Sequence, residues 1–230
     1  MSSKSILAVL FDLDNTLVSL SEALTRLYEH WYLTRPTQYR PEDRETFIKR
    51  MNDFDAFGYG TIPDIYRHML CMWPGSFLSV DEAVRAHSTL MPQMVRLDTK
   101  TEKMLRRFNS VGIPVGVVTN GESILQWGKL RSTGIADLVT ACVVSEDFGA
   151  HKPDHSIFTH ALELTGASPE STLFVGDNPE HDIIGADALG MTTAWISLGR
   201  EWTIASVQPA HVLQHVWEAD ELISTVGRFL

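Results

Sequence analysis

Residues 6–17, ILAVLFDLDNTL, constrain the fold of this chain more than any other stretch. The six apolar residues 6–11 have the length and branching of a strand that is buried on both faces. Asp12 and Asp14 follow directly, and Thr16 lies two residues further on. Two carboxylates at the end of a buried strand are costly unless a cation neutralises them, and hard divalent cations prefer carboxylate oxygens. The stretch therefore predicts a metal site at a sheet edge, with a turn that merely caps a helix as the alternative.

The composition limits the class of protein. A chain of 230 residues holds one large or two modest domains. Its formal net charge of −10 argues against nucleic acid as a partner, so an anionic substrate must be attracted by a local positive group. We see no apolar run long enough to span a membrane and no secretory leader. The two cysteines, Cys71 and Cys142, fit a reducing compartment, so we expect a cytoplasmic protein. The sequence does not choose between a monomer and a homodimer.

The segment after Leu17 is predicted to be helical. Between residues 20 and 97 no run reads as a buried strand, and prolines and glycines separate four helical runs, at 21–34, 42–54, 62–73 and 80–94. Ser79 and Glu82 have the spacing of a capping box for the last of them. We therefore expect residues 19–97 to form an all-helical domain inserted after the first strand.

Helices and strands alternate from Thr99 onward. Thr99 and Glu102 have the spacing of another capping box. The predicted helices cover 99–110, 122–132, 154–165, 179–189 and a last segment from about 218; the predicted strands cover 115–118, 139–144, 173–175, 192–196 and a short piece near 212–213. Strands separated by single helices indicate a doubly wound parallel sheet. We therefore predict an α/β fold in which residues 1–18 and 98–230 form the core domain.

Polar side chains lie after four of the predicted strands, counting the strand at 6–11, either directly or in the segment that follows. They are Asp12 and Asp14, Thr119 and Asn120, Lys152, and Asp177 with Asp182. Because the carboxyl ends of parallel strands lie at one edge of the sheet, we expect these groups to converge there. Each has an ordinary explanation when taken alone, such as a strand-end hydroxyl or a solvated lysine. Their joint occurrence in four distant segments predicts a catalytic site.

This set of motifs resembles the haloacid dehalogenase-like hydrolase superfamily. The resemblance is carried by FDLDNT (11–16), VVTNG (117–121), HKPD (151–154) and GDNPEHD (176–182). A further tract resembles the branch of small-metabolite phosphatases with a helical cap after the first strand; it comprises Asn120, Gly121, Gln126, Lys129, Leu130 and Gly134. The resemblance implies a Rossmann-like core with a helical cap, and a Mg²⁺-dependent phosphatase acting on a small phosphorylated metabolite.

The resemblance also implies roles for the strand-end residues. Asp12 would attack phosphorus and form an aspartyl-phosphate, while Asp14 would protonate the leaving alcohol and later deprotonate the hydrolytic water. Mg²⁺ would be held by Asp12, the main-chain carbonyl of Asp14, and Asp177. Thr119 and the Asn120 backbone would bind phosphoryl oxygens, and Asp182 and Thr16 would orient the site without touching the metal. Lys152 would neutralise charge on the transferred group.

The same residues also allow functions other than a phosphatase. A dehalogenase of the same superfamily is disfavoured because a halide leaves without a proton and does not need Asp14. A phosphomutase, a non-enzymatic phospho-acceptor module and a binding protein with a decayed site remain as alternatives. Specificity is expected to reside in the insertion, with Trp31, Phe57, Tyr59 and Met94 as candidates.

Overall fold

The computed structural model describes residues 5–34, 43–55 and 61–224. The chain divides into two compact units, one made of Met1–Val18 with Leu97–Leu230 and the other of Ser19–Arg96. The first unit contains the sheet and is assembled from two segments that are distant in sequence. The second is one continuous insertion; the sequence predicts it over 19–97, one residue longer at its C-terminal end.

The sheet is parallel throughout the described residues. Its six strands lie in the order β3-β2-β1-β4-β5-β6. They are β1 (Ala8–Phe11), β2 (Val115–Thr119), β3 (Ala141–Val144), β4 (Thr172–Gly176), β5 (Thr192–Ile196) and β6 (His211–Leu213). This order confirms the predicted doubly wound α/β fold.

Strand β1 lies where the strand order reverses. The chain runs from β1 to β2 and β3 on one side and then crosses to β4 on the other. Phe11 is in register with Val117 of β2 and Val175 of β4, and the main-chain N–H of Asp12 donates to the Val175 carbonyl at 2.9 Å. In open α/β sheets, ligands bind beyond the carboxyl ends of the strands at such a reversal.

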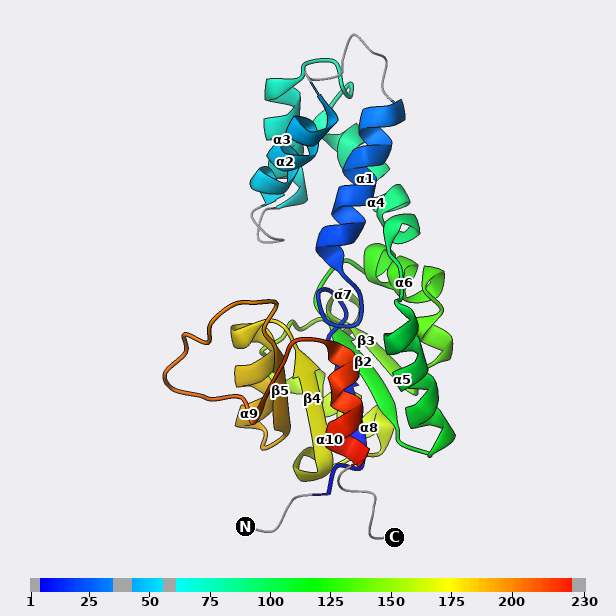
Figure 1. The fold of residues 1–230 in the computed structure, drawn as a ribbon, viewed down its shortest axis with the longest axis vertical. Coiled ribbons are helices and arrows are strands. Elements are labelled where there is room, and N and C mark those ends of the chain that lie inside the picture. Colours follow the sequence, from blue (N-terminus) through cyan, green and yellow to red (C-terminus); the bar gives the residue numbers. More distant parts are fainter. Residues whose placement is uncertain (1–4, 35–42, 56–60, 225–230) are drawn as a thin grey trace. The chain divides into compact units, whose positions relative to one another are not determined.

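Helices cover both faces of the sheet (Figure 1). Side chains alternate along a strand, so neighbouring residues of β1 face opposite sides. Leu10 belongs to a buried cluster that includes Phe158 of α8 (His155–Thr165) and Ala186 of α9 (Gly185–Ala188). Phe11 stacks on Phe108 of α5 (Thr99–Ser110), with ring centroids 6.5 Å apart. The central strand is therefore buried on both faces, as its apolar run predicts.

Two features of the sheet unit differ from the sequence prediction. The N-cap of α5 is Asp98, whose carboxylate accepts from the main-chain N–H of Lys100 and Thr101, so the predicted Thr99–Glu102 capping box is wrong. The helix predicted over 179–189 begins as a π-helix, η5 (Pro179–Ile184), and continues as α9. Its predicted start is right, because Asn178 caps the first turn and Pro179 follows.

The remaining elements of the sheet unit are short or lie between strands. They are α6 (Ser123–Ser132), α7 (Ser145–Phe148), α10 (Ala219–Ser224), and the 3-10 turns η3 (Ile135–Asp137), η4 (Pro169–Ser171) and η6 (Val216–Glu218). Helix α10 is tied to α5 by an ion pair between Asp220 and Arg107.

The inserted unit is helical over its described residues. It contains α1 (Leu20–Thr34), α2 (Arg44–Asp55), α3 (Ile62–Met72) and α4 (Val80–Met94), and Ser79 caps α4 as predicted. Trp31 packs among Tyr28, Tyr66 and Phe77 with ring centroids 5.2–5.9 Å away and is only 2% exposed. This residue therefore serves the core of the inserted unit.

The other specificity candidates have different positions. Met94 is the last residue of α4, and its carbonyl accepts a hydrogen bond from Arg26 at 2.9 Å. Phe57 and Tyr59 lie outside the described residues. Across the described ranges, the helices are too short or too polar to cross a lipid bilayer.

Candidate active site

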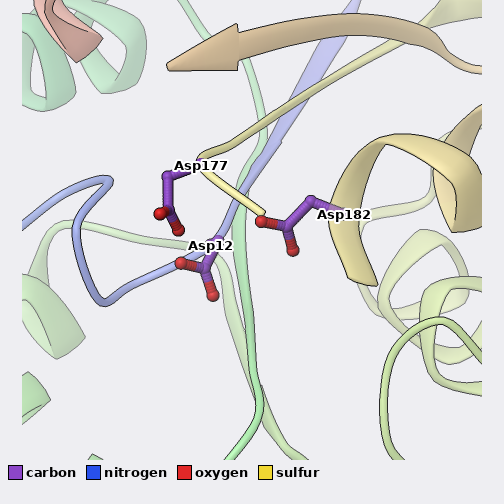
Figure 2. Close-up of side chains that lie close together, drawn as sticks. All are labelled: Asp12, Asp177 and Asp182. Atoms are coloured by element: carbon purple, nitrogen blue, oxygen red, sulfur yellow. The ribbon is translucent and has the colours of Figure 1, made fainter. Parts of the chain in front are cut away.

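Three carboxylates meet at the carboxyl edge of the sheet. Asp12 follows β1, Asp177 follows β4, and Asp182 lies in η5. Oxygens of the three side chains lie within 4.8 Å of one another. Figure 2 shows them converging from the three segments. Asp12 and Asp182 are almost fully buried, at 7% and 1% exposed.

Lys152 holds two of these carboxylates together. Its Nζ lies 2.6 Å from Oδ1 of Asp12 and 2.7 Å from Oδ1 of Asp182. The other oxygen of Asp182 accepts from the main-chain N–H of Asn178 at 2.9 Å. The side-chain amide of Asn120 accepts from the Lys152 N–H and donates to the Lys152 carbonyl, which fixes the loop that carries the lysine. The structure thus brings together residues from four predicted motifs.

The electrostatics of this cluster favour a bound cation. Burial raises the pKa of Asp12, while the Lys152 ammonium opposes that change. Burial, reinforced by Asp182, raises the pKa of Asp177 to about 6, with Arg200 opposing. Burial alone would lower the pKa of Lys152, but Asp12 and Asp182 raise it well above its usual range. Lys152 and Arg200 supply two positive charges to three carboxylates, so the group keeps an excess of negative charge, and three carboxylates at this spacing suit a hard divalent cation.

Asp14 points to a different set of partners. The Nζ of Lys129 lies 2.9 and 2.7 Å from its two carboxylate oxygens, and Nε2 of Gln126 donates to one of them at 3.0 Å. The same Gln126 amide donates to the hydroxyl of Thr119 at 2.5 Å. The hydroxyl of Thr16 is buried, and the described residues provide no hydrogen-bond partner for it. Thr119 is therefore joined to Asp14 through one glutamine, and Thr16 is not joined to the acidic cluster.

Sequence reasoning did not assign three cationic or amide side chains that contact the site. In the sequence, Lys129 and Gln126 stand only as members of the tract that resembles the phosphatase branch. Arg200 donates to both the main-chain carbonyl and the carboxylate of Asp177, at 2.6 and 3.0 Å. The sequence signal for the first two is their position between Leu125 and Leu130 on one predicted helix, three residues apart and therefore on one face. In the structure both side chains are buried, with Lys129 5% and Gln126 2% exposed.

The chain belongs to the haloacid dehalogenase-like hydrolase family, because the model of that family matches residues 9–196. This match confirms the resemblance that the four motifs carry.

Curated relatives agree with that assignment, and a solved structure shares the fold. The chain is 28% identical to the glyceraldehyde 3-phosphate phosphatase of Methanocaldococcus jannaschii, over 85% of this chain and 86% of that protein. It is 34% identical to the pyrimidine 5'-nucleotidase YjjG of Escherichia coli, but that match spans only 47% of this chain and 49% of the relative. The magnesium-bound HAD-hydrolase YfnB of Bacillus subtilis has the same fold, with a TM-score of 0.75 at 22% identity, covering 96% of this chain and 99% of that one.

Proposed function

We propose that this protein is a Mg²⁺-dependent phosphatase that hydrolyses a small phosphorylated metabolite through an aspartyl-phosphate on Asp12. The observation that carries the proposal is the convergence of Asp12, Asp177 and Asp182 around Lys152 at the reversal point of the sheet. Relatives named as phosphatases or nucleotidases support the reaction class.

The first half of the reaction transfers the phosphoryl group. A carboxylate oxygen of Asp12 forms a bond to phosphorus while the bond from phosphorus to the ester oxygen breaks. The leaving oxygen takes a proton from Asp14 and departs as the alcohol. Because Asp12 follows a rigid central strand and its N–H is bonded to β4, it is held in a fixed place for attack.

The second half restores the enzyme. A water molecule gives a proton to Asp14 and attacks the phosphorus of the aspartyl-phosphate. The bond between phosphorus and the Asp12 oxygen breaks, inorganic phosphate leaves, and Asp12 returns as a carboxylate. Thr119 and the main-chain N–H of Asn120 bind phosphoryl oxygens during both halves.

Charge at the site comes from this chain's lysine and from a metal ion. Lys152 remains protonated between Asp12 and Asp182, since both carboxylates favour its charged form. Asp12, the Asp14 carbonyl and Asp177 would hold Mg²⁺, which supplies positive charge to the phosphoryl oxygens. Asp182 serves Lys152, because its two oxygens accept from that lysine and from the Asn178 N–H. In this proposal residues 19–97 form a cap that selects the substrate.

The test of the nucleophile is Asp12→Asn. We expect purified wild-type protein to release phosphate from p-nitrophenyl phosphate with Mg²⁺ and not with EDTA. Asp12→Asn should lower kcat at least about a thousandfold, since loss of a nucleophile removes the covalent route. Asp137→Asn changes an exposed acid of the same unit and should leave kcat unchanged. Turnover by Asp12→Asn near the wild-type rate would refute the assignment.

The substrate class needs a separate experiment. A panel of glyceraldehyde 3-phosphate, pyrimidine 5'-nucleotides, pyrophosphate and sugar phosphates would be compared by kcat/KM. A 2-haloacid included in the panel tests the dehalogenase alternative, and release of halide instead of phosphate would contradict the proposal. Retention of one phosphate per chain would indicate an acceptor module, and isomerised sugar phosphate would indicate a mutase.

A further inference from the structure

Helix α6 places a buried lysine against Asp14. The side chain of Lys129 is 6% exposed, and that of Asp14 is 21% exposed. A lysine ammonium is strongly hydrated, and its burial is costly unless it is paired. The contacts at 2.9 and 2.7 Å put its Nζ between both oxygens of one carboxylate. Such a two-oxygen contact restricts the rotation of that carboxylate.

Gln126 adds a second restraint from the same helix. It lies three residues before Lys129 and therefore on the same face of α6. Its Nε2 donates to Oδ2 of Asp14 at 3.0 Å, to the Thr119 hydroxyl at 2.5 Å and to the Asn120 carbonyl at 3.3 Å. This one amide therefore ties the loop after β1 to the end of β2.

The two buried lysines serve different acids. Lys152 contacts Asp12 and Asp182, whereas Lys129 contacts Asp14. The described carboxylate cluster consists of Asp12, Asp177 and Asp182, so the Asp14 side chain is held apart from it. Since both Lys129 contacts end on the Asp14 carboxylate, restraint of this side chain is the role that the geometry of Lys129 supports.

We propose that Lys129, supported by Gln126, is a positioning residue that holds the Asp14 side chain where it exchanges a proton with the leaving oxygen. This inference rests on the proposed function. Lys129 touches no reacting atom in it and acts through Asp14. A loss of Lys129 should therefore matter most when the leaving group needs a proton.

Leaving-group dependence separates this role from simple support of the fold. p-Nitrophenolate is a stable anion and leaves without a proton, whereas an alkoxide does not. The ratio kcat/KM reports the steps up to departure of the leaving group. In Lys129→Met we expect kcat/KM for the best alkyl phosphate of the panel to fall at least about tenfold, and that for p-nitrophenyl phosphate to fall less than about threefold. Lys129→Arg should recover part of the loss.

Two controls accompany this comparison. Lys103→Met removes an exposed lysine of α5 and should change neither ratio. Thermal melting establishes that the variants fold; if Lys129→Met does not, Lys129→Gln removes the charge and the contact to both Asp14 oxygens and gives the same comparison. In an Asp14→Asn background, Lys129→Met should cause no further loss of kcat/KM, because the lysine acts only through that acid.

The outcomes distinguish this inference from the proposed function. An equal fall on both substrates, no fall on either, or a full additional loss in the Asp14→Asn background would overturn the role of Lys129 alone. Absence of Mg²⁺-dependent turnover by the wild type, or activity of Asp12→Asn, would overturn the proposed function itself.

Discussion

At the scale of single residues, the site is a balance of buried charges. The contacts described above join four carboxylates, Asp12, Asp14, Asp177 and Asp182, to three cations, Lys129, Lys152 and Arg200. In the proposed function, a chain of net charge −10 attracts its anionic substrate through these local cations and through bound Mg²⁺.

Removal of Lys152 should destabilise the metal-free protein. Lys152→Met leaves Asp12 and Asp182 buried without their cation, and breaking a buried pair typically costs about 3–5 kcal/mol of unfolding free energy. Urea unfolding in EDTA would measure this loss, and added Mg²⁺ should recover part of it. The exposed-lysine control Lys103→Met should unfold like the wild type. Equal stability of Lys152→Met and wild type would show that the buried pair is not needed for folding.

The two thiols should differ in reactivity. Cys142 of β3 is partly buried, and burial raises the pKa of its thiol to about 11, whereas Cys71 of α3 is exposed. The thiolate is the reactive form, so a raised pKa leaves less of it at a given pH, and the rate grows as the pH approaches that pKa. At pH 8, Ellman's reagent should therefore modify Cys71 rapidly and Cys142 slowly. The variant Cys71→Ser should show only the slow phase until guanidinium unfolds it; a rapid phase in that variant would contradict the burial of Cys142.

The sequence predicts the site residues that follow strands, but not the side chains that contact them. Two of the site residues, Asp12 and Asp177, directly follow strands, and Lys152 lies in the chain that follows β3. Because the sheet is parallel, the carboxyl ends of these strands lie at one edge. The partners of Asp14 and Asp177 depend on the rotation of α6 and the path of the loop after β5. No periodic pattern encodes those two features, so the sequence does not identify Lys129 and Arg200 as site residues.

Among the helices and strands, the sequence predicts the position of a helix start better than the side chain that caps it. The sequence predicts Thr99 and Glu102 as a capping box, but Asp98 accepts from the N–H groups of Lys100 and Thr101 at 2.8 and 3.1 Å. Glu102 instead pairs with Arg106 one turn later. Several residues near a helix start can act as caps, and the choice among them depends on the path of the preceding chain, which periodicity does not report.

The cap of α5 gives an element-scale prediction. Asp98→Ala should lower the free energy of unfolding by about 1 kcal/mol, because two N–H groups of the first turn lose their acceptor. Thr99→Ala is the matched control: Thr99 is exposed and already helical, so its replacement should be neutral or slightly favourable. Chemical denaturation of both variants measures the difference. If Thr99→Ala lowered the free energy of unfolding more than Asp98→Ala, Thr99 and not Asp98 would be the capping residue.

The helix after β4 is predicted from the sequence, but its π-helical winding is not. Such bulges are rare and often occur at functional sites. Here η5 carries Asp182, whose oxygens reach back to Asn178 and across to Lys152. Breaker residues in the motif GDNPEHD predict where this helix begins but not its winding. The contacts of the buried Asp182 carboxylate join residues distant in sequence, and a local sequence pattern does not encode them.

At the scale of the whole molecule, every residue of the acidic site comes from one of the two units. Asp12 lies before the insertion, and Lys152, Asp177 and Asp182 lie after it, yet all belong to the unit that contains the sheet. The insertion separates β1 from β2 in sequence without removing β1 from the centre of the sheet. The inserted unit has its own aromatic core around Trp31. In the proposed function, bound Mg²⁺ should therefore stabilise the sheet unit specifically.

Addition and removal of Mg²⁺ tests this expectation. A ligand that binds only the folded state stabilises it, by about 2.7 kcal/mol at one hundred times its Kd. Mg²⁺ should raise the Tm of the sheet unit by several degrees, and EDTA should reverse the rise. Hydrogen exchange should slow at β1 and β4 and remain unchanged at α1 and α3. Asp177→Asn removes one of the clustered carboxylates and should abolish both effects, whereas Asp187→Asn changes an exposed acid of α9 and should abolish neither. An undiminished rise in Asp177→Asn would place the ion elsewhere on the molecule.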